Sequence, residues 1–239
     1  MDQIEQSLRI KLAAAHHIIH YHGWDDLLAT HLSVRIPNTE HLLITPHNTA
    51  FEEVSASKLI KSDFNGNITG HSDYQIMPQA TNIHASIYKH SGTIMSAMHT
   101  HSINGVAVSS LECGLLFFNQ QSLRFYNDIA YHEFNGLALQ NEGEEMVQSL
   151  GNNKVMILKN HGLLSTGGNI EDTLYNLYYL EQCCDIQIKT LSSGKKIIEL
   201  SDEICKLTKK QFDSIQSAHL EFETLTRRIE SKSKIDYQS

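Results

Sequence analysis

The sequence predicts an α/β protein in which helices cover a central sheet, giving three layers. Apolar residues recur at helical spacing near the N-terminus and after residue 169. Short apolar runs typical of strands lie between these segments, and turn residues separate the two kinds of segment. Because helices and sheets bury their apolar faces against one another, such a chain is expected to fold in layers around a core.

A helix is predicted close to the N-terminus. Apolar residues recur there at helical spacing from Ile4 to Ile19, and Gly23 is typical of a helix end. Four histidines lie on this segment without an accompanying cysteine or carboxylate, so we interpret them as a polar helix face rather than a metal cluster. These histidines are His16, His17, His20 and His22.

The remaining elements follow from apolar runs, caps and turn residues. We expect strands at 32–36, 42–45 and 94–98, a hairpin-like turn at 65–67, a helix at about 80–90 and a helix capped by Ser102. We further expect strand-like pieces at 115–118 and 129–131, a helix at 142–150, strands at 155–158 and 163–165, a long helix capped by Asn169 and a final helix from Ser201. No linker divides the chain, so one domain is expected over 1–230, with a frayed tail at 231–239.

Composition limits the classes of function. The chain has 239 residues, 41% of them hydrophobic, and a net charge of -8. No lysine- or arginine-rich stripe offsets that charge, which argues against nucleic acid as a partner. No apolar run is long enough to cross a membrane, and the N-terminus lacks the pattern of a secretion signal. The four cysteines show no zinc-site spacing, so reduced, mostly buried thiols and a cytoplasmic location are expected.

The most informative motif is His99-Thr100-His101, followed about sixty residues later by His161. Both segments come after strand-like apolar runs, and strand side chains two apart point the same way. Three imidazoles at two strand ends can form one face of a catalytic metal site that leaves positions for substrate. A short His-x-His pattern also arises by chance, and solvated or core-packed histidines are the alternative.

Segments around the histidines match a known family in order, spacing and residue type. They are Gly23-Trp24-Asp25-Asp26, Thr30 to Arg35, Leu43 to Pro46, Phe51 to Val54, Asp63 to Asn67, Ile83 to Tyr88, His99 to Ser102, Leu123 to Tyr126 and Asn160 to Leu164. On these residues the chain resembles the class II aldolase/adducin family from about Leu8 to Phe212. Within the family it is most similar to the adducin-like branch of short bacterial proteins.

The resemblance implies an α/β/α sandwich around a largely antiparallel sheet. It also implies a homotetramer with active sites where subunits meet. The family's enzymes hold a divalent metal on three histidines, which correspond to His99, His101 and His161. Zinc is the expected ion, with Mn²⁺, Co²⁺ and Fe²⁺ as alternatives. The metal serves as a Lewis acid when a carbon–carbon bond breaks or a proton leaves a hydroxy-carbonyl substrate.

The chain departs from the family's aldolases in its acid/base residue, in its phosphate-binding segments and at Asn119-Gln120-Gln121, where the family's interface tyrosine is absent. Ala80 stands where the aldolases carry the acid/base carboxylate, and alanine cannot transfer a proton. The residues aligned with the phosphate-binding segments are also changed, and proline there removes a backbone donor. The candidate substrate-binding residues that remain are His31, His47, Asn48, Gln79 and Arg124. An ion pair within the oligomer is the alternative role for Arg124.

The catalytic proton carrier is left open by the sequence. A metal-bound hydroxide, His31, Tyr126 and Tyr131 are candidates, and packing in the core or an interface is the alternative for both tyrosines. His84 is expected to be a hydrogen-bonded core histidine, with a hydrogen bond that supports the metal site as the alternative. The resulting hypothesis is a metal-dependent lyase of the class II aldolase type with a small-molecule substrate. The alternative is a non-catalytic oligomeric binding or scaffold protein similar to the adducin head.

Overall fold

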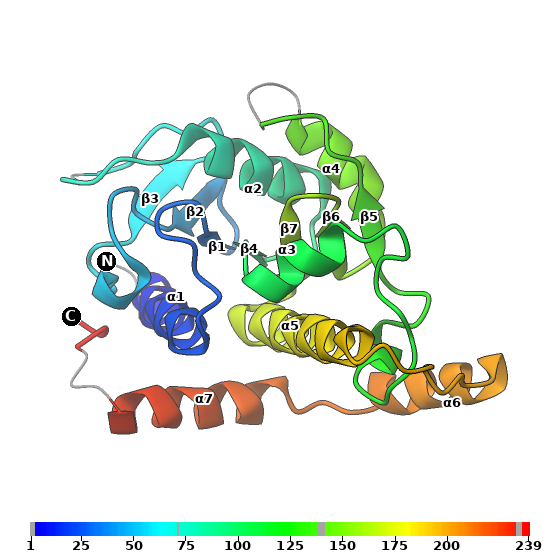
Figure 1. The fold of residues 1–239 in the computed structure, drawn as a ribbon. Helices are drawn as coiled ribbons and strands as arrows, with labels where there is room; N and C mark the ends of the chain where they lie inside the picture. The colour runs from blue at the N-terminus through cyan, green and yellow to red at the C-terminus, as the bar shows by residue number, and fades with distance from the viewer. Residues whose placement is uncertain (1–2, 71, 138–141, 233–235) are drawn as a thin grey trace.

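The computed structural model describes residues 3–70, 72–137, 142–232 and 236–239 (Figure 1). Seven strands form one sheet in the order β3-β2-β1-β4-β7-β6-β5. The strands are β1 (His31–Arg35), β2 (His41–Ile44), β3 (Ile60–Asp63), β4 (Ser96–Thr100), β5 (Ala130–His132), β6 (Val155–Leu158) and β7 (Gly162–Gly167). All neighbouring strands are antiparallel except β5 and β6. The predicted α/β fold with a largely antiparallel sheet is therefore confirmed.

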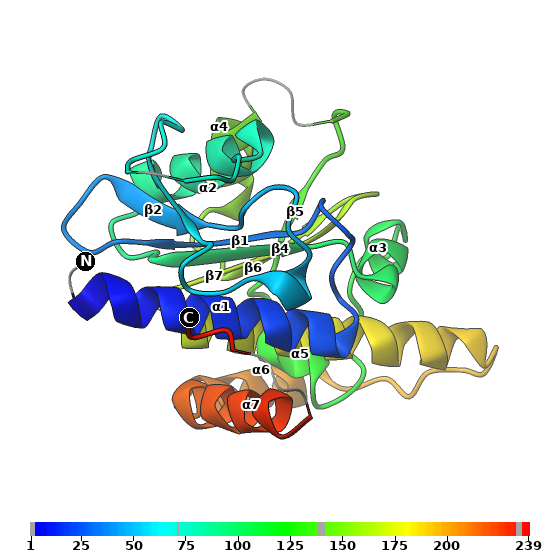
Figure 2. The ribbon, with the colours of Figure 1, turned by 90° about the vertical axis from the view of Figure 1, so that its left-hand side faces the viewer.

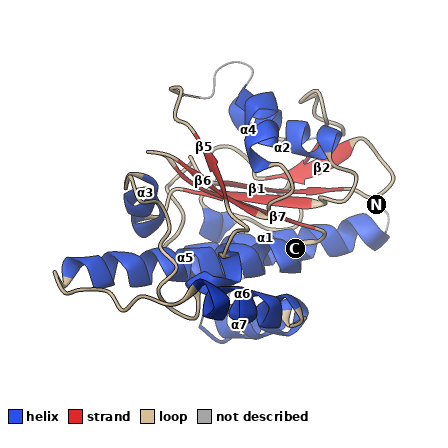
Figure 3. Ribbon diagram, turned by 90° about the vertical axis from the view of Figure 1, so that its right-hand side faces the viewer, coloured by secondary structure: helices blue, strands red, loops and turns tan. Residues whose placement is uncertain are grey.

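Helices cover both faces of the sheet. They are α1 (Gln3–His22), α2 (Pro78–His90), α3 (Ile103–Ser109), α4 (Glu142–Leu150), α5 (Ile170–Ser192), α6 (Asp202–Asp213) and α7 (Ala218–Lys232), with short 3-10 turns at Phe51–Glu53 and Ser122–Phe125. Figure 2 shows α2 and α4 on one face of the sheet and α1 and α5 on the other, with α6 and α7 packed outside them. Figure 3 shows α3 at one end of the sheet. The order of layers is the predicted one, with an additional outer helical layer.

Strand alternation divides the core into two halves. On β4, Met98 packs in the half next to α1 and α5, whereas Ala97 packs in the half next to α2 and α4. His99 and His101 lie two and four residues beyond Ala97, so the alternation directs both toward the α2 face. Thr100 points to the α5 face, where its hydroxyl donates to Glu181.

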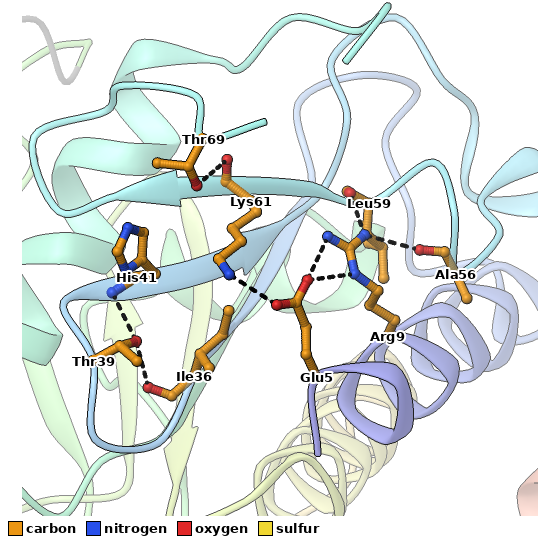
Figure 4. A network of polar contacts seen from close by, with 9 residues as sticks. All are labelled: Glu5, Arg9, Ile36, Thr39, His41, Ala56, Leu59, Lys61 and Thr69. Carbon is orange, nitrogen blue, oxygen red and sulfur yellow. Dashed lines mark hydrogen bonds and ion pairs between the residues drawn. The ribbon is translucent and has the colours of Figure 1, made fainter. Parts of the chain in front are cut away.

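Buried charged residues attach α1 to the edge of the sheet (Figure 4). Arg9 pairs with Glu5 at 3.0 Å and donates to the backbone carbonyls of Ala56 and Leu59. Lys61 on β3 contacts the second carboxylate oxygen of Glu5 at 2.8 Å. Both Glu5 and Arg9 are less than 10% exposed. This network joins α1 to the sheet through charged groups that are all ion-paired or hydrogen-bonded.

Capping residues act as the sequence predicts. The side chains of Ser102, Asn169 and Ser201 each accept a hydrogen bond from the backbone of the following helical turn. Gly23 adopts a left-handed φ of 70° at the end of α1. None of the helices in the described part of the chain is long and apolar enough to span a membrane.

Two expected elements differ from the structure, and one observed strand was not expected. Residues 115–118 are not a strand, because Gln187 and Tyr131 side chains take the backbone N–H groups of Leu116 and Leu115. The single final helix is instead α6 and α7, separated by a break at 214–217. Helix α6 packs on the 3-10 turn at Ser122–Phe125, whereas α7 packs on α1 and α5. The sequence reading also missed β3, which carries few apolar residues.

The histidines of α1 also differ from expectation, and near the C-terminus one side chain is packed. Tyr237 is only 3% exposed and its carbonyl oxygen accepts from the Ala56 N–H, whereas Asp236, Gln238 and Ser239 are exposed. Residues 233–235 lie outside the described residues. His16 and His17 are buried and hydrogen-bonded instead of forming a polar face. His20 does meet two carboxylates outside α1, that of the nearby Asp25 and that of Glu52, which is distant in sequence.

Candidate metal centre

The structure brings together His99, His101 and His161. His99 lies on β4, His101 follows the strand, and His161 lies in the turn between β6 and β7. The ring centroids are 4.5 Å apart for His99 and His101, and 4.8 Å apart for His161 with each of them. One ring nitrogen from each lies within 4.8 Å of the others. We call these residues the three-histidine cluster.

Hydrogen bonds at Nδ1 orient two of these rings. Nδ1 of His99 is 2.8 Å from the carbonyl oxygen of Leu163, and Nδ1 of His101 is 3.3 Å from the Asp26 carboxylate. Both partners only accept hydrogen bonds, so the ring protons belong on Nδ1. Nε2 of His99 and Nε2 of His101 then both carry a lone pair, and the two atoms face each other at 2.7 Å. This is a donor set suited to a divalent metal.

His161 is held by the backbone around it. Its N–H contacts the Ser109 hydroxyl at 3.2 Å, and the N–H of Asn160 donates to the Ser109 carbonyl, which fixes the turn to the end of α3. A Cβ built on Gly162 would overlap the carbonyl oxygen of Thr100, so only glycine allows β7 to approach β4 this closely. Burial lowers the pKa of His161 to about 4, which keeps its ring neutral.

Glu181 on α5 supports the strand that carries His99 and His101, and sequence reasoning missed it. Its two carboxyl oxygens accept hydrogen bonds from the hydroxyls of Thr100 and Ser102, the neighbours of His101. The side chain is only 2% exposed, and burial raises the pKa of Glu181 to about 7. The sequence did contain a signal for this role, because Glu181 lies four residues after Leu177, at a position of the helical pattern where an apolar residue is expected.

His31 lies beside the cluster. It is paired with His99 across β1 and β4, and the ring centroids are 4.9 Å apart. Burial holds the pKa values of His31 and His99 well below the ordinary histidine value. Nδ1 of His31 is 2.7 Å from Nε2 of His84, a fully buried residue on α2. His84 is the hydrogen-bonded core histidine that the sequence predicts.

A small cavity lies beside His31 where the sequence lacks a carboxylate. The cavity has a volume of about 10 Å³ and is lined by residues that include His31, His47, Met77 and Ala80. Nδ1 of His47 is buried and has no hydrogen-bond partner among the described residues. Asn48 is exposed and Gln79 half-buried, and neither lines the cavity. Of the aligned substrate-binding candidates, His31 and His47 are therefore the two that meet at this point.

Arg124, Tyr126 and Tyr131 have partners elsewhere in the chain. The Arg124 guanidinium lies over the rings of Tyr179 and Phe212 and lines a groove of about 840 Å³ to which the three-histidine cluster contributes no residue. The hydroxyl of Tyr126 donates to Asp202. The Tyr131 hydroxyl accepts from the backbone of Leu115. Within one chain, the structure does not bring these three side chains to the cluster.

Known proteins of similar sequence cover most of this chain. The family description "Class II Aldolase and Adducin N-terminal domain" matches residues 10–188. The chain is 38% identical over 201 residues to a Pseudomonas aeruginosa protein named for aldolase class 2, covering 84% of this chain and 78% of that protein. It is 34% identical over 198 residues to alpha-adducin of Mus musculus, covering 81% of this chain but only 27% of adducin.

Solved structures extend the comparison to the fold. An aldolase II superfamily protein from Pseudomonas syringae superposes with a TM-score of 0.96 at 33% identity, covering 100% of this chain and 98% of that one. An L-fuculose 1-phosphate aldolase from Glaciozyma antarctica superposes with a TM-score of 0.88 at 27% identity, covering 98% and 93%. The residues matched by the family description include all three histidines of the cluster. This chain belongs to the class II aldolase and adducin family.

Proposed function

We propose that this chain is a metal-dependent enzyme of the class II aldolase type, carrying out lyase or enolisation chemistry on a hydroxy-carbonyl compound. One observation supports the metal above all others. The Nε2 atoms of His99 and His101 face each other at 2.7 Å, while both Nδ1 atoms are turned to acceptors. Two facing lone pairs repel each other, and a shared cation removes that repulsion.

His99, His101 and His161 would hold the ion, and zinc is the metal we propose, with Mn²⁺, Co²⁺ and Fe²⁺ as alternatives. When bound, a divalent ion supplies Lewis-acid stabilisation of negative charge on a substrate oxygen. The remaining work belongs to side chains of this protein. His31 is the one proton-carrier candidate that lies beside the cluster, and Ala80 offers no carboxylate next to it.

Metal content tests the first part of the proposal. Protein purified without a histidine tag is expected to contain about one divalent ion per chain by elemental analysis. His161→Ala should lose the ion, because two imidazoles alone bind it weakly. His219→Ala is the matched control, since His219 is an exposed histidine on α7. Metal retained by His161→Ala would overturn the ligand assignment.

Hydrogen exchange tests the chemistry. Zinc-loaded protein is incubated in D₂O with dihydroxyacetone, and NMR follows loss of the hydrogen next to the carbonyl. The wild type should exchange it faster than His161→Ala. Ala80→Glu should raise the rate by about 10²-fold, because its carboxylate would be added next to His31 and could transfer the proton. Zinc-loaded wild type that exchanges no faster than His161→Ala would refute the enzymatic proposal.

A second candidate is a non-catalytic oligomeric binding or scaffold protein, like the adducin head. The observation that favours it is Ala80, which is 1% exposed beside a cavity of about 10 Å³ next to His31, at the position where the family resemblance places the carboxylate. We propose a homotetramer, a cytoplasmic location and no membrane or nucleic-acid partner for both candidates. Analytical ultracentrifugation checks the tetramer. The exchange experiment separates the two candidates.

A further inference from the structure

Four buried polar side chains lead from the three-histidine cluster into the core between β1 and α2. β1 supplies His31 and Ser33, which lie two residues apart on one face of the strand. α2 supplies His84 and Tyr88, which lie one helical turn apart. The exposed fraction is 6% for His31, 0% for Ser33 and His84, and 1% for Tyr88. Polar groups buried this deeply have to satisfy one another.

Three hydrogen bonds join these side chains in series. Nδ1 of His31 lies 2.7 Å from Nε2 of His84. Nδ1 of His84 contacts the hydroxyl of Ser33, whose oxygen lies 2.5 Å from the Tyr88 hydroxyl. Burial lowers the pKa of His84 to about 3, so its ring is neutral and carries one proton. A neutral ring donates at one nitrogen and accepts at the other, which gives the chain a single direction.

The Tyr88 hydroxyl decides that direction. Among the described residues, its hydrogen-bond partner is the Ser33 hydroxyl, and the backbone N–H of Ala97 lies nearby and can only donate. In the opposite direction Ser33 would donate to Tyr88, and the phenol proton would be buried without an acceptor. A buried donor without an acceptor is strongly unfavourable. Tyr88 therefore donates to Ser33, Ser33 to Nδ1 of His84, and Nε2 of His84 to Nδ1 of His31.

The two neighbouring histidines then carry opposite tautomers. Nδ1 of His99 faces the carbonyl of Leu163, so its proton is on Nδ1 and its Nε2 presents a lone pair. Nδ1 of His31 accepts a hydrogen bond from Nε2–H of His84, so the proton of the His31 ring is on Nε2. Among the described residues, the side-chain partner of the His31 ring is His84, at Nδ1, so Nε2 is the ring nitrogen left to meet a ligand. His31 thus presents an N–H beside the cluster and no lone pair for a metal.

We propose that Tyr88, Ser33 and His84 are positioning residues that hold His31 as a hydrogen-bond donor to a substrate oxygen beside the three-histidine cluster. The identity of that acceptor rests on the proposed function, whereas the tautomer of His31 does not. A donor at this point favours substrates that carry a carbonyl or alkoxide oxygen next to the ion. It stabilises the negative charge that develops there when a carbon–carbon or carbon–hydrogen bond breaks.

Neutron diffraction from crystals grown in D₂O tests the tautomer directly. We expect deuterium on Nε2 of His31 and none on its Nδ1. Ser33→Ala removes the donor to His84 and should spread deuterium over both nitrogens of His31. Ser96→Ala is the matched control, because Ser96 is an equally buried strand serine whose hydroxyl donates to the Ser33 carbonyl. Deuterium on Nδ1 of His31 in the wild type, or equal occupancies in the two variants, overturns the proposal.

Ligand binding gives a second readout, by calorimetry of zinc-loaded protein with acetohydroxamate. Ser33→Ala should bind this oxygen chelator about 3- to 10-fold more weakly than Ser96→Ala at equal zinc content. Ser33→Thr, which keeps the hydroxyl, should restore binding. If Ser33→Ala fails to fold, Tyr88→Phe replaces it, since it removes the first donor and keeps the ring. If Ser33→Ala and Ser96→Ala bind the chelator equally at equal zinc content, the positioning role is overturned. If none of the proteins binds zinc, the proposed function is overturned, and the neutron experiment alone then decides the tautomer of His31.

Discussion

Glu181 illustrates how a single buried side chain supports the candidate site. It accepts hydrogen bonds from both hydroxyls that flank His101, so it fixes the strand end from the face opposite the imidazoles. Burial raises its pKa to about 7, well above the ordinary 4.5. The charged form is therefore less favourable in the folded protein than in the unfolded chain.

Glu181→Gln should change how stability depends on pH. A raised pKa means that the folded state binds more protons between pH 4.5 and 7, so this group's contribution to stability falls as pH rises through that window. Between pH 4.5 and pH 7, the unfolding free energy of the wild type should therefore fall by on the order of 3 kcal/mol more than that of Glu181→Gln. Urea unfolding from pH 4.5 to 8 measures this, with the exposed Glu223→Gln as control. Parallel curves for wild type and Glu181→Gln would contradict it.

Gly162 is the second position where one residue decides the site. Gly162→Ala would place a Cβ against the Thr100 carbonyl and displace the turn that carries His161. Metal affinity should fall by about 10-fold or more, although every ligand remains. Competition with a chromogenic chelator measures the affinity. In Gly168→Ala the new Cβ meets nothing closer than 3.8 Å, so this control should bind normally. Equal affinity in both variants would show that the close approach is unimportant.

At the scale of elements, α1 is attached to the sheet by charge as well as by apolar packing. Arg9 is 7% exposed and bonds to Glu5 and to two backbone carbonyls from the segment before β3. The edge strand β3 contributes Lys61 to the same carboxylate. Few apolar residues lie on β3, so this network compensates for weak packing at the edge of the sheet.

Arg9→Ala should therefore destabilise the protein strongly. The change leaves a buried carboxylate with a single partner and two carbonyls without their donor, which costs about 3 kcal/mol. Lys189→Ala is the control, because Lys189 forms an exposed ion pair with Asp185 within α5. That variant should stay within about 0.5 kcal/mol of the wild type. Urea unfolding at neutral pH compares the two, and similar losses in both would disprove a special role for the buried network.

At the scale of the whole molecule, neutral buried imidazoles make the fold sensitive to acid. Burial lowers the pKa of His16 and His84 to about 3 and that of His22 and His161 to about 4. In the unfolded chain these rings titrate near the ordinary value of 6.5. Below that pH the unfolded state binds more protons, so stability is lost as pH falls.

The metal-free protein should lose stability steeply between pH 6.5 and 4. Each of these histidines contributes about 1.4 kcal/mol per pH unit, opposed by the single contribution of Glu181. Urea midpoints at pH 7 and pH 5 measure the loss. His16→Gln should reduce the slope by one proton, and His90→Gln, at an exposed position on α2, is the control substitution. A midpoint independent of pH over this range would disprove the mechanism.

Much of the fold follows from local sequence signals. Residues 142–150 and 155–158 have the bounds predicted for them, and the caps of α3, α5 and α6 are the predicted residues. These features depend on contacts within a few residues, which periodicity and capping chemistry express directly. The strand predicted at 115–118 was wrong because its backbone depends on contacts that are distant in sequence. The hydrogen-bond partners of this segment lie on β5 and α5.

The sequence by itself determined the layered α/β architecture, the family and the three histidines that the fold brings together. Strand alternation is enough to place His99 and His101 on one face. Only the tertiary structure decided which groups support them. Glu181, His84 and Ser33 reach the site through side-chain contacts between residues about 50 to 80 positions apart. A ring's tautomer is set by the partner that its other nitrogen meets, and that partner exists only after the chain has folded.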